Sequence, residues 1–272
     1  MVTDGHNHTR HFSPDAQQSI DELIDKALKT GIQRIGITEH YEIDFPEQDG
    51  LNWMFDLDEY YKTFLDWRKK AAPIEILMGI EFGYQSHIAS KIDETADKIP
   101  FDVVLLSNHL FRGRDFYDHR ECYSLPKTEL HREYIGIMAE MCERCDNFDV
   151  AAHYDYINRY TPNLDSFVLY EDCPREFDRF FEALISKEKA LEINTKSILK
   201  HKERGFTRTM PDPEVIKRYL AMGGKMITLG SDSHESEGLG ACFDETIEYL
   251  KSFGIRELFY FKNRKPYTEG IK

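Results

Sequence analysis

The sequence predicts an α/β fold, a distorted (β/α)7 barrel of the TIM-like kind, formed as one domain by residues 1–272. The first observation is that short apolar runs alternate with longer amphipathic segments along the chain. The second is that the predicted strands end in side chains that bind metals or transfer protons. A closed parallel barrel opens all its strand ends on one face, which an open doubly wound sheet does not do. The polar residues therefore favour the barrel.

The predicted elements alternate in order along the chain. A strand at 2–3 precedes a helix that is expected to begin at Ser13-Pro14-Asp15 and to end at Gly31. Further strands are predicted at 34–38, 75–80, 101–106, 149–152, 190–193 and 225–229. Further helices are predicted at 56–71, 88–99, 127–145, 172–187, 213–222 and 241–253. One extra strand, at 258–261, is expected at an edge.

Charge and composition narrow the classes of partner. The chain has 35 basic and 49 acidic residues and a net charge of -14, so it repels nucleic acid and anionic membranes at long range. No apolar run approaches the about 20 residues of a membrane-spanning helix, and Met1-Val2-Thr3-Asp4 lacks a basic-then-apolar signal. We therefore expect a cytoplasmic protein without a nucleic-acid or membrane partner. The oligomeric state stays open.

The number and spacing of the cysteines also fit a cytoplasmic protein. Their number, five, is odd, which is typical of reduced thiols in a cytoplasmic protein. Cys142 and Cys145 have CxxC spacing, but no second CxxC or paired histidine follows them. We expect ordinary thiols at these positions rather than a zinc or redox site.

Metal-binding side chains follow every predicted strand. His6 and His8 can face one cation, because residues i and i+2 of an extended segment point the same way. The other groups at strand ends are Asp4, Glu39-His40, Glu81, Asn108-His109, His153, Glu192, Asn194, Asp232 and His234. A lone histidine after a strand is commonly just a hydrogen-bonded loop residue, but six at equivalent positions predict a cluster. Mixed imidazole and carboxylate ligands suit two or three ions of zinc, iron or manganese better than magnesium.

These motifs resemble the polymerase and histidinol phosphatase (PHP) superfamily over nearly the whole chain. The matching motifs are His6-Asn7-His8-Thr9, Thr38-Glu39-His40, Gly79-Ile80-Glu81-Phe82-Gly83-Tyr84, Asn108-His109, Ala152-His153 and Gly230-Ser231-Asp232-Ser233-His234. The third of these and the segment from His153 to Tyr160 are similar to the histidinol-phosphatase branch. The resemblance implies the PHP fold, a distorted seven-stranded barrel, and a trinuclear metal centre.

The resemblance also implies a ligand set. One metal takes His6, His8, Glu81 and Asp232, and a second takes the bridging Glu81 with His109 and His153. The third takes His40, His234 and a residue of the loop after the first strand. Many relatives have a histidine there, in a Phe-Cys-Pro-His-like run. This chain reads Phe12-Ser13-Pro14-Asp15, so Asp15 takes the expected place, with His11 as the alternative ligand or with Asp15 acting only as a helix cap.

By resemblance, the reaction is hydrolysis of a phosphomonoester, with L-histidinol phosphate of histidine biosynthesis as the leading substrate. A hydroxide bridging two metals attacks phosphorus, Glu81 holds the ions, and Asp232 or His234 protonates the leaving group. The predicted substrate contacts are Arg159 and Lys196 for phosphate, Glu192 or Asn194 for the ammonium or imidazole, and Trp53, Phe55 and Tyr84 as an apolar wall.

Two other functions remain open at this point. One is a phosphoesterase of the same superfamily that acts on another phosphomonoester or on a nucleotide 3′ end, which the net charge disfavours for polymeric substrates. The other is a metal-binding protein without catalytic activity. The full set of ligands argues against it, because a lapsed enzyme has no reason to keep an open multinuclear site.

Overall fold

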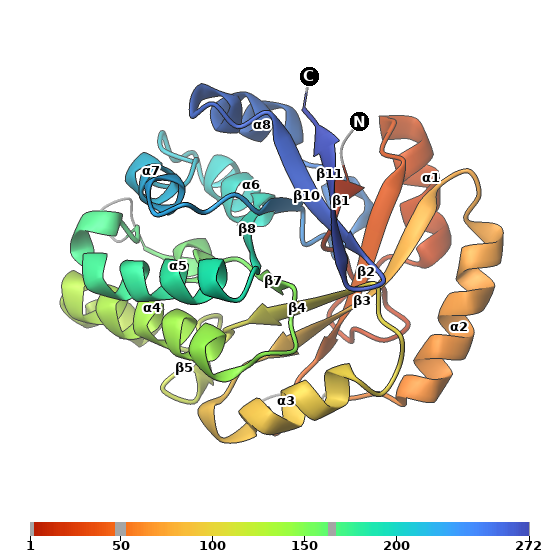
Figure 1. The fold of residues 1–272 in the computed structure, drawn as a ribbon, viewed down its shortest axis with the longest axis horizontal. Coiled ribbons are helices and arrows are strands. Elements are labelled where there is room, and N and C mark those ends of the chain that lie inside the picture. Colours follow the sequence, from red (N-terminus) through yellow and green to blue (C-terminus); the bar gives the residue numbers. More distant parts are fainter. Residues whose placement is uncertain (1–2, 47–52, 163–166, 272) are drawn as a thin grey trace.

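The computed structural model describes residues 3–46, 53–162 and 167–271. Its centre is a sheet of seven parallel strands, and the predicted fold class is confirmed (Figure 1). In spatial order the strands are β1 (Thr3–Asp4), β2 (Arg34–Tyr41), β3 (Glu75–Gly83), β4 (Val103–Ser107), β7 (Val150–Ala151), β8 (Ala190–Asn194) and β9 (Ile227–Gly230). Val2, the predicted first residue of the first strand, lies outside the described residues.

The sheet curves until its first and last strands meet, which makes a nearly closed barrel. The Gly5 amide donates a hydrogen bond to the Leu229 carbonyl at 2.9 Å, and Asn7 forms a parallel bridge with Ser233. A Cβ atom on Gly36 would lie 2.5 Å from the Gly5 carbonyl oxygen. The close approach of β1 and β2 therefore requires a glycine at this position.

Helices cover the outside of the barrel (Figure 1). They are α1 (Ile20–Thr30), α2 (Leu57–Lys70), α3 (Ala89–Ala96), α4 (Lys127–Arg144), α5 (Pro174–Ser186), α6 (Thr195–Glu203), α7 (Pro213–Ala221) and α8 (Phe243–Ser252). Short 3-10 turns occur at η1 (Ser86–Ile88), η2 (Arg120–Ser124), η3 (Tyr156–Tyr160), η5 (Tyr170–Asp172) and η6 (Ser236–Gly238). Among the described helices, none has the length and apolar character that a bilayer span requires.

The first helix begins later than predicted. Ser19 and Glu22 form a capping box, in which each side chain bonds the other residue's backbone amide, so α1 starts at Ile20. Ser13 and Asp15 belong instead to a loop folded back over the barrel. Helix α6 was not predicted, because its sequence is polar and shows little apolar periodicity.

Two hairpins lie outside the seven-stranded sheet of the described residues. A small one joins β5 (Leu110–Phe111) to β6 (Arg114–Asp115) beyond the carboxyl end of β4. The other joins β10 (Glu257–Lys262) to β11 (Lys265–Gly270), where a single edge strand was predicted. It lies across one opening of the barrel (Figure 1).

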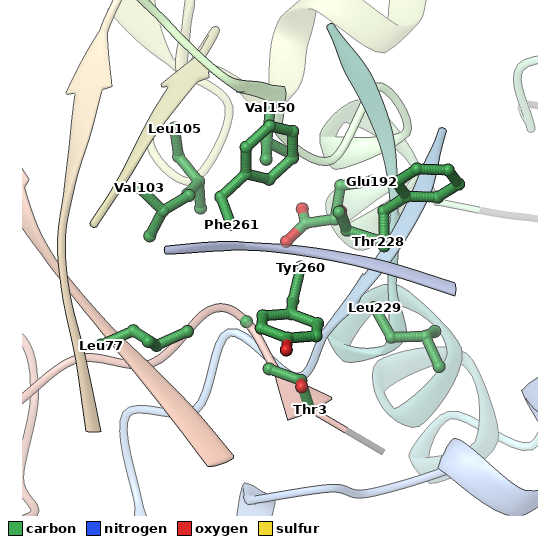
Figure 2. A pocket seen from close by; sticks show the side chains of 12 residues that line it. Thr3, Leu77, Val103, Leu105, Val150, Glu192, Thr228, Leu229, Tyr260 and Phe261 are labelled. Carbon is green, nitrogen blue, oxygen red and sulfur yellow. The ribbon is translucent and has the colours of Figure 1, made fainter. Parts of the chain in front are cut away.

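The β10–β11 hairpin closes the amino end of the barrel with apolar contacts. Phe261 packs in one cluster with Val103, Leu105 and Val150. Figure 2 shows Phe261 on the side of the strand that faces these residues. A cavity of about 20 Å³ remains between hairpin and barrel. The amino end of the barrel is therefore filled by packed side chains and has little open space.

Candidate metal centre

Nine side chains that were predicted as metal ligands meet at the opposite, carboxyl end of the barrel. They are His6, His8, Asp15, His40, Glu81, His109, His153, Asp232 and His234. Most follow directly on strand ends, and His40 of β2 lies beside Glu81 of β3 in the sheet register. The barrel geometry brings them together from positions spread over more than two hundred residues.

Glu81 is the central carboxylate of this cluster and is fully buried. Its Oε2 lies 2.8 Å from His40 Nδ1, 3.3 Å from His6 Nε2 and 3.5 Å from His8 Nε2. Its Oε1 lies 2.7 Å from His153 Nε2 and 3.3 Å from the corresponding nitrogen of His109. A carboxylate with imidazoles on both oxygens has the geometry of a ligand shared by two cations.

Asp232 is the second buried carboxylate. Its Oδ1 lies 3.3 Å from His8 Nε2 and 3.9 Å from His6 Nε2. Its Oδ2 lies 2.6 Å from the Arg159 guanidinium, and its backbone carbonyl accepts a hydrogen bond from Lys196 at 2.8 Å. Asp232 therefore connects the imidazole cluster with two cationic side chains.

The loop that precedes α1 contributes Asp15. Its Oδ2 lies 2.8 Å from His234 Nε2 and 3.6 Å from His40 Nε2. The ring of His11 packs instead on Phe12, with 4.6 Å between ring centroids. The geometry places Asp15, and not His11, with the two histidines of the third predicted site.

The polar atoms of this cluster fit divalent cations. Several buried atoms lie close to other ligand-type atoms but form no hydrogen bond within the described part of the chain: His6 Nε2, His8 Nε2, His40 Nδ1, Glu81 Oε2 and Asp232 Oδ1. Leaving such atoms unsatisfied costs about 1–3 kcal/mol each. Side chains of the cluster also form groups of three whose ligand atoms all lie within 4.8 Å of one another. Imidazole nitrogens and carboxylate oxygens are the donors that zinc, iron and manganese accept.

Protonation states in the cluster are coupled. Burial opposes ionisation of Glu81, but His6, His40 and His109 outweigh it and hold the pKa of this carboxyl well below its usual range. Burial lowers the pKa of His153 to about 4. For His6, His40 and His109, burial lowers the pKa and adjacent carboxylates raise it, with a net rise, whereas burial keeps the pKa of His8 and His234 lowered. The protons concerned are those that a bound cation would displace.

Glu192 lies beneath the cluster and not in the predicted substrate position. Its Oε1 is 2.8 Å from His6 Nδ1, and its Oε2 accepts a hydrogen bond from the His153 amide at 2.8 Å. Asn194 accepts from Arg159 at 2.9 Å and donates to Glu192 at 3.1 Å. A pocket opens above the cluster, and neither residue lines it, because β8 directs both side chains into the barrel. They orient imidazoles and a guanidinium.

Glu42, which was not among the predicted ligands, also contacts the cluster. Its Oε1 lies 2.6 Å from His109 Nδ1, which leaves the other ring nitrogen of His109 facing Glu81. A Cβ on Gly83 would lie 1.7 Å from a Glu42 oxygen, so the last glycine of the Gly-Ile-Glu-Phe-Gly run makes room for this carboxylate. The available signal was the position of Glu42, directly after the last residue of β2 and two residues after His40.

A pocket of about 270 Å³ opens above the cluster. Its lining includes the cations Arg159, Lys196 and Lys200 and the aromatic residues Phe45, Trp53, Tyr156 and Tyr160. Tyr84 does not belong to it, because its buried hydroxyl donates to Glu140 of α4 at 2.8 Å. Phe55 packs instead against Phe12 and Tyr60. Of the predicted apolar wall, only Trp53 lines the pocket.

Comparisons with known proteins show the family of this chain. Residues 4–196 match the family model of the PHP domain. The chain is 32% identical over 269 residues to a protein described as a probable histidinol-phosphatase of Clostridium acetobutylicum, which covers 98% of this chain and 100% of the relative. It is 30% identical over 267 residues to the histidinol-phosphatase of Lactococcus lactis subsp. lactis, covering 96% of this chain and 95% of the relative.

Solved structures agree as well. The crystal structure of histidinol phosphate phosphatase from Lactococcus lactis subsp. lactis, complexed with zinc, L-histidinol and phosphate, is similar with a TM-score of 0.85 and 30% identity over 98% of each chain. A structure from Listeria monocytogenes shares the fold at 19% identity, with a TM-score of 0.74 over 89% of this chain and 99% of the other.

Proposed function

The chain belongs to the PHP domain family, and from this premise we propose that it is a metal-dependent histidinol-phosphatase, which hydrolyses L-histidinol phosphate to L-histidinol and phosphate. The observation that carries the proposal is the cluster of nine ligand-type side chains directly below a pocket that contains three cationic side chains. Cations in a chain of net charge -14 mark a local site for an anion such as a phosphoryl group.

Two or three divalent ions, zinc, manganese or iron, are the proposed cofactors. The proposed ligands are His6, His8, Glu81 and Asp232 for one ion, Glu81, His109 and His153 for the second, and Asp15, His40 and His234 for the third. Ions bound there would neutralise the phosphoryl oxygens and make a water molecule a stronger nucleophile.

Arg159 is the proposed phosphate-binding residue. Its guanidinium is buried and held by Asp232 and Asn194, so its orientation is set before substrate binds. A planar guanidinium has five N–H donors, and those left over can donate to phosphoryl oxygens. Lys196 adds a second positive charge at the same wall of the pocket.

The leaving alkoxide needs a proton, and Asp232 and His234 are the proposed source. His234 Nδ1 lies 3.4 Å from Asp232 Oδ1 and 2.6 Å from Lys196 Nζ. Burial opposes ionisation of Asp232, but Arg159 and Lys196 hold the pKa of its carboxyl well below the usual range. We therefore propose that these linked groups act together and that Asp232 on its own is a poor proton donor.

Turnover measurements test the proposed function. The protein is loaded with manganese or zinc, and kcat/KM is compared for histidinol phosphate and a panel of phosphomonoesters that includes nucleotides. The expected result is a clear preference for histidinol phosphate, abolished by a chelator and restored by the metal. Equal rates on all esters would indicate a general phosphomonoesterase of the family. A metal-replete sample that hydrolyses none of them would contradict the assignment as an enzyme.

A further inference from the structure

The pocket contains more carboxylates than its proposed metal and phosphate chemistry uses. Asp15, Glu42 and Asp232 are each within 2.8 Å of an imidazole or guanidinium nitrogen. Glu235 is exposed, so water can solvate its charge. Asp115 is partly buried and, in the described part of the chain, forms no ion pair within 4.0 Å. It is therefore the pocket carboxylate that lacks a counterion.

Neutral donors hold Asp115 in place. Its oxygens accept hydrogen bonds of 3.2 Å from the Tyr156 hydroxyl, and one also accepts from the Tyr117 amide at 2.7 Å. These donors orient the carboxylate but do not neutralise it. Burial accordingly raises the pKa of Asp115. A partly desolvated carboxylate of this kind gains most from a cation, and Asp115 lines the pocket, where a bound ligand can supply one.

Tyr156 links this carboxylate to the phosphate-binding side of the pocket. The Arg159 guanidinium lies over the Tyr156 ring, 4.9 Å from its centroid, while the hydroxyl of the same ring reaches Asp115. The site for an anion and the unpaired carboxylate are thus separated by about one aromatic side chain. In histidinol phosphate, four covalent bonds separate the ammonium nitrogen from phosphorus, which is a similar span.

We propose that Asp115 determines substrate specificity by binding the ammonium group of the phosphomonoester. Tyr160 lines the pocket together with Asp115, and its ring, 5.5 Å from that of Tyr156 between centroids, adds an aromatic surface for the same cation. The inference rests on the proposed function and deepens it: the pocket selects esters of amino alcohols, in which a cation lies on the carbon next to the ester methylene. Esters without that cation leave Asp115 unpaired.

The test compares two substrates that differ only in the amine. The kcat/KM of the wild-type protein is measured for histidinol phosphate and for 3-(imidazol-4-yl)propyl phosphate, the same ester without the amino group. A charged hydrogen bond predicts a preference of about 10- to 100-fold for the amine. In Asp115→Asn this preference should fall toward one, mainly because the KM for histidinol phosphate rises. Asp118→Asn, an exposed carboxylate three residues away, is the control and should keep the full preference.

The outcomes separate this inference from the proposed function. If the wild type hydrolyses histidinol phosphate but shows no preference for the amine, the inference is wrong and the proposed function stands, with no variant needed. If Asp115→Asn lowers turnover of both esters equally, the residue is structural and the inference is wrong. Restoration of the preference in Asp115→Glu would support it. If the wild type hydrolyses other esters but not histidinol phosphate, both proposals fail.

Discussion

The two ends of the barrel are built from the same strands but differ in chemistry. At the amino end, Phe261 fills the opening with apolar contacts and leaves a cavity of about 20 Å³. At the carboxyl end, buried imidazoles and carboxylates surround a pocket of about 270 Å³. His153 and Asp232, at φ values of 26° and 50°, occupy a backbone region that non-glycine residues rarely adopt. The comparison teaches that the packed end stabilises a fold whose other end is arranged for binding.

One residue belongs to both ends. Glu192 lines the small cavity under the β10–β11 hairpin, where Figure 2 shows its carboxylate, and the same carboxylate bonds His6 and the amide of His153. A substitution of Glu192 is therefore expected to change both stability and function. Substitutions further from the middle of the barrel should change only one of the two.

The largest effect on function is expected for His153→Asn at the carboxyl end. Removing this imidazole deprives Glu81 of its nearest partner, at 2.7 Å, so the variant should lose one metal and at least about 100-fold in kcat. Metal content by elemental analysis and turnover are the measurements. Full metal occupancy in the variant would show that our assignment of the second site is wrong. The chelated variant and the chelated wild type should unfold at similar denaturant concentrations.

The opposite pattern is expected for Phe261→Ala at the amino end. Truncating this buried ring should lower the free energy of unfolding by about 3–5 kcal/mol. Metal content should stay complete and kcat should change by less than about twofold, since the ring is remote from the ligands. The control is Lys265→Ala on β11, an exposed position, which should cost no more than about 0.5 kcal/mol. A Phe261→Ala variant of normal stability would mean that the hairpin does not close the core.

A smaller effect is expected for Glu42→Gln and Gly83→Ala. Both changes disturb the contact between Glu42 and His109 Nδ1, the first by removing charge and the second by placing a methyl group where the carboxylate lies. Losing such an orienting partner lowers metal affinity by about 10- to 100-fold. Titration of the chelated protein with metal measures this affinity. Gly136→Ala is the control, because a Cβ there meets nothing closer than 4.0 Å. Unchanged affinity in both variants would leave Glu42 without a role at the centre.

The seven strands and the side chains that meet at their ends are predictable from the sequence, because apolar runs ending in histidine or carboxylate are local signals. The sequence does not show how deep each side chain lies. Glu192 and Asn194 were expected in the pocket but point beneath it, and Tyr84 turns toward α4. Depth depends on sheet register and closure, which are tertiary properties. The predicted beginning of α1 was wrong for a local reason. Ser13 and Ser19 are both candidate helix caps, but only Ser19 has a glutamate three residues later that completes a capping box.

The short first strand has a consequence for the order of synthesis. Asp4 accepts hydrogen bonds from the amides of Ser231 and Gly240, both at 2.9 Å, and His8 donates its amide to Ser233. During translation His6 and His8 leave the ribosome well before the residues that fix their backbone, which follow only after more than two hundred further residues. At 5–20 residues per second this interval lasts roughly 10–50 s. The proposed metal site is therefore complete only late in synthesis, and a nascent chain carries these two histidines without their partners for most of that time.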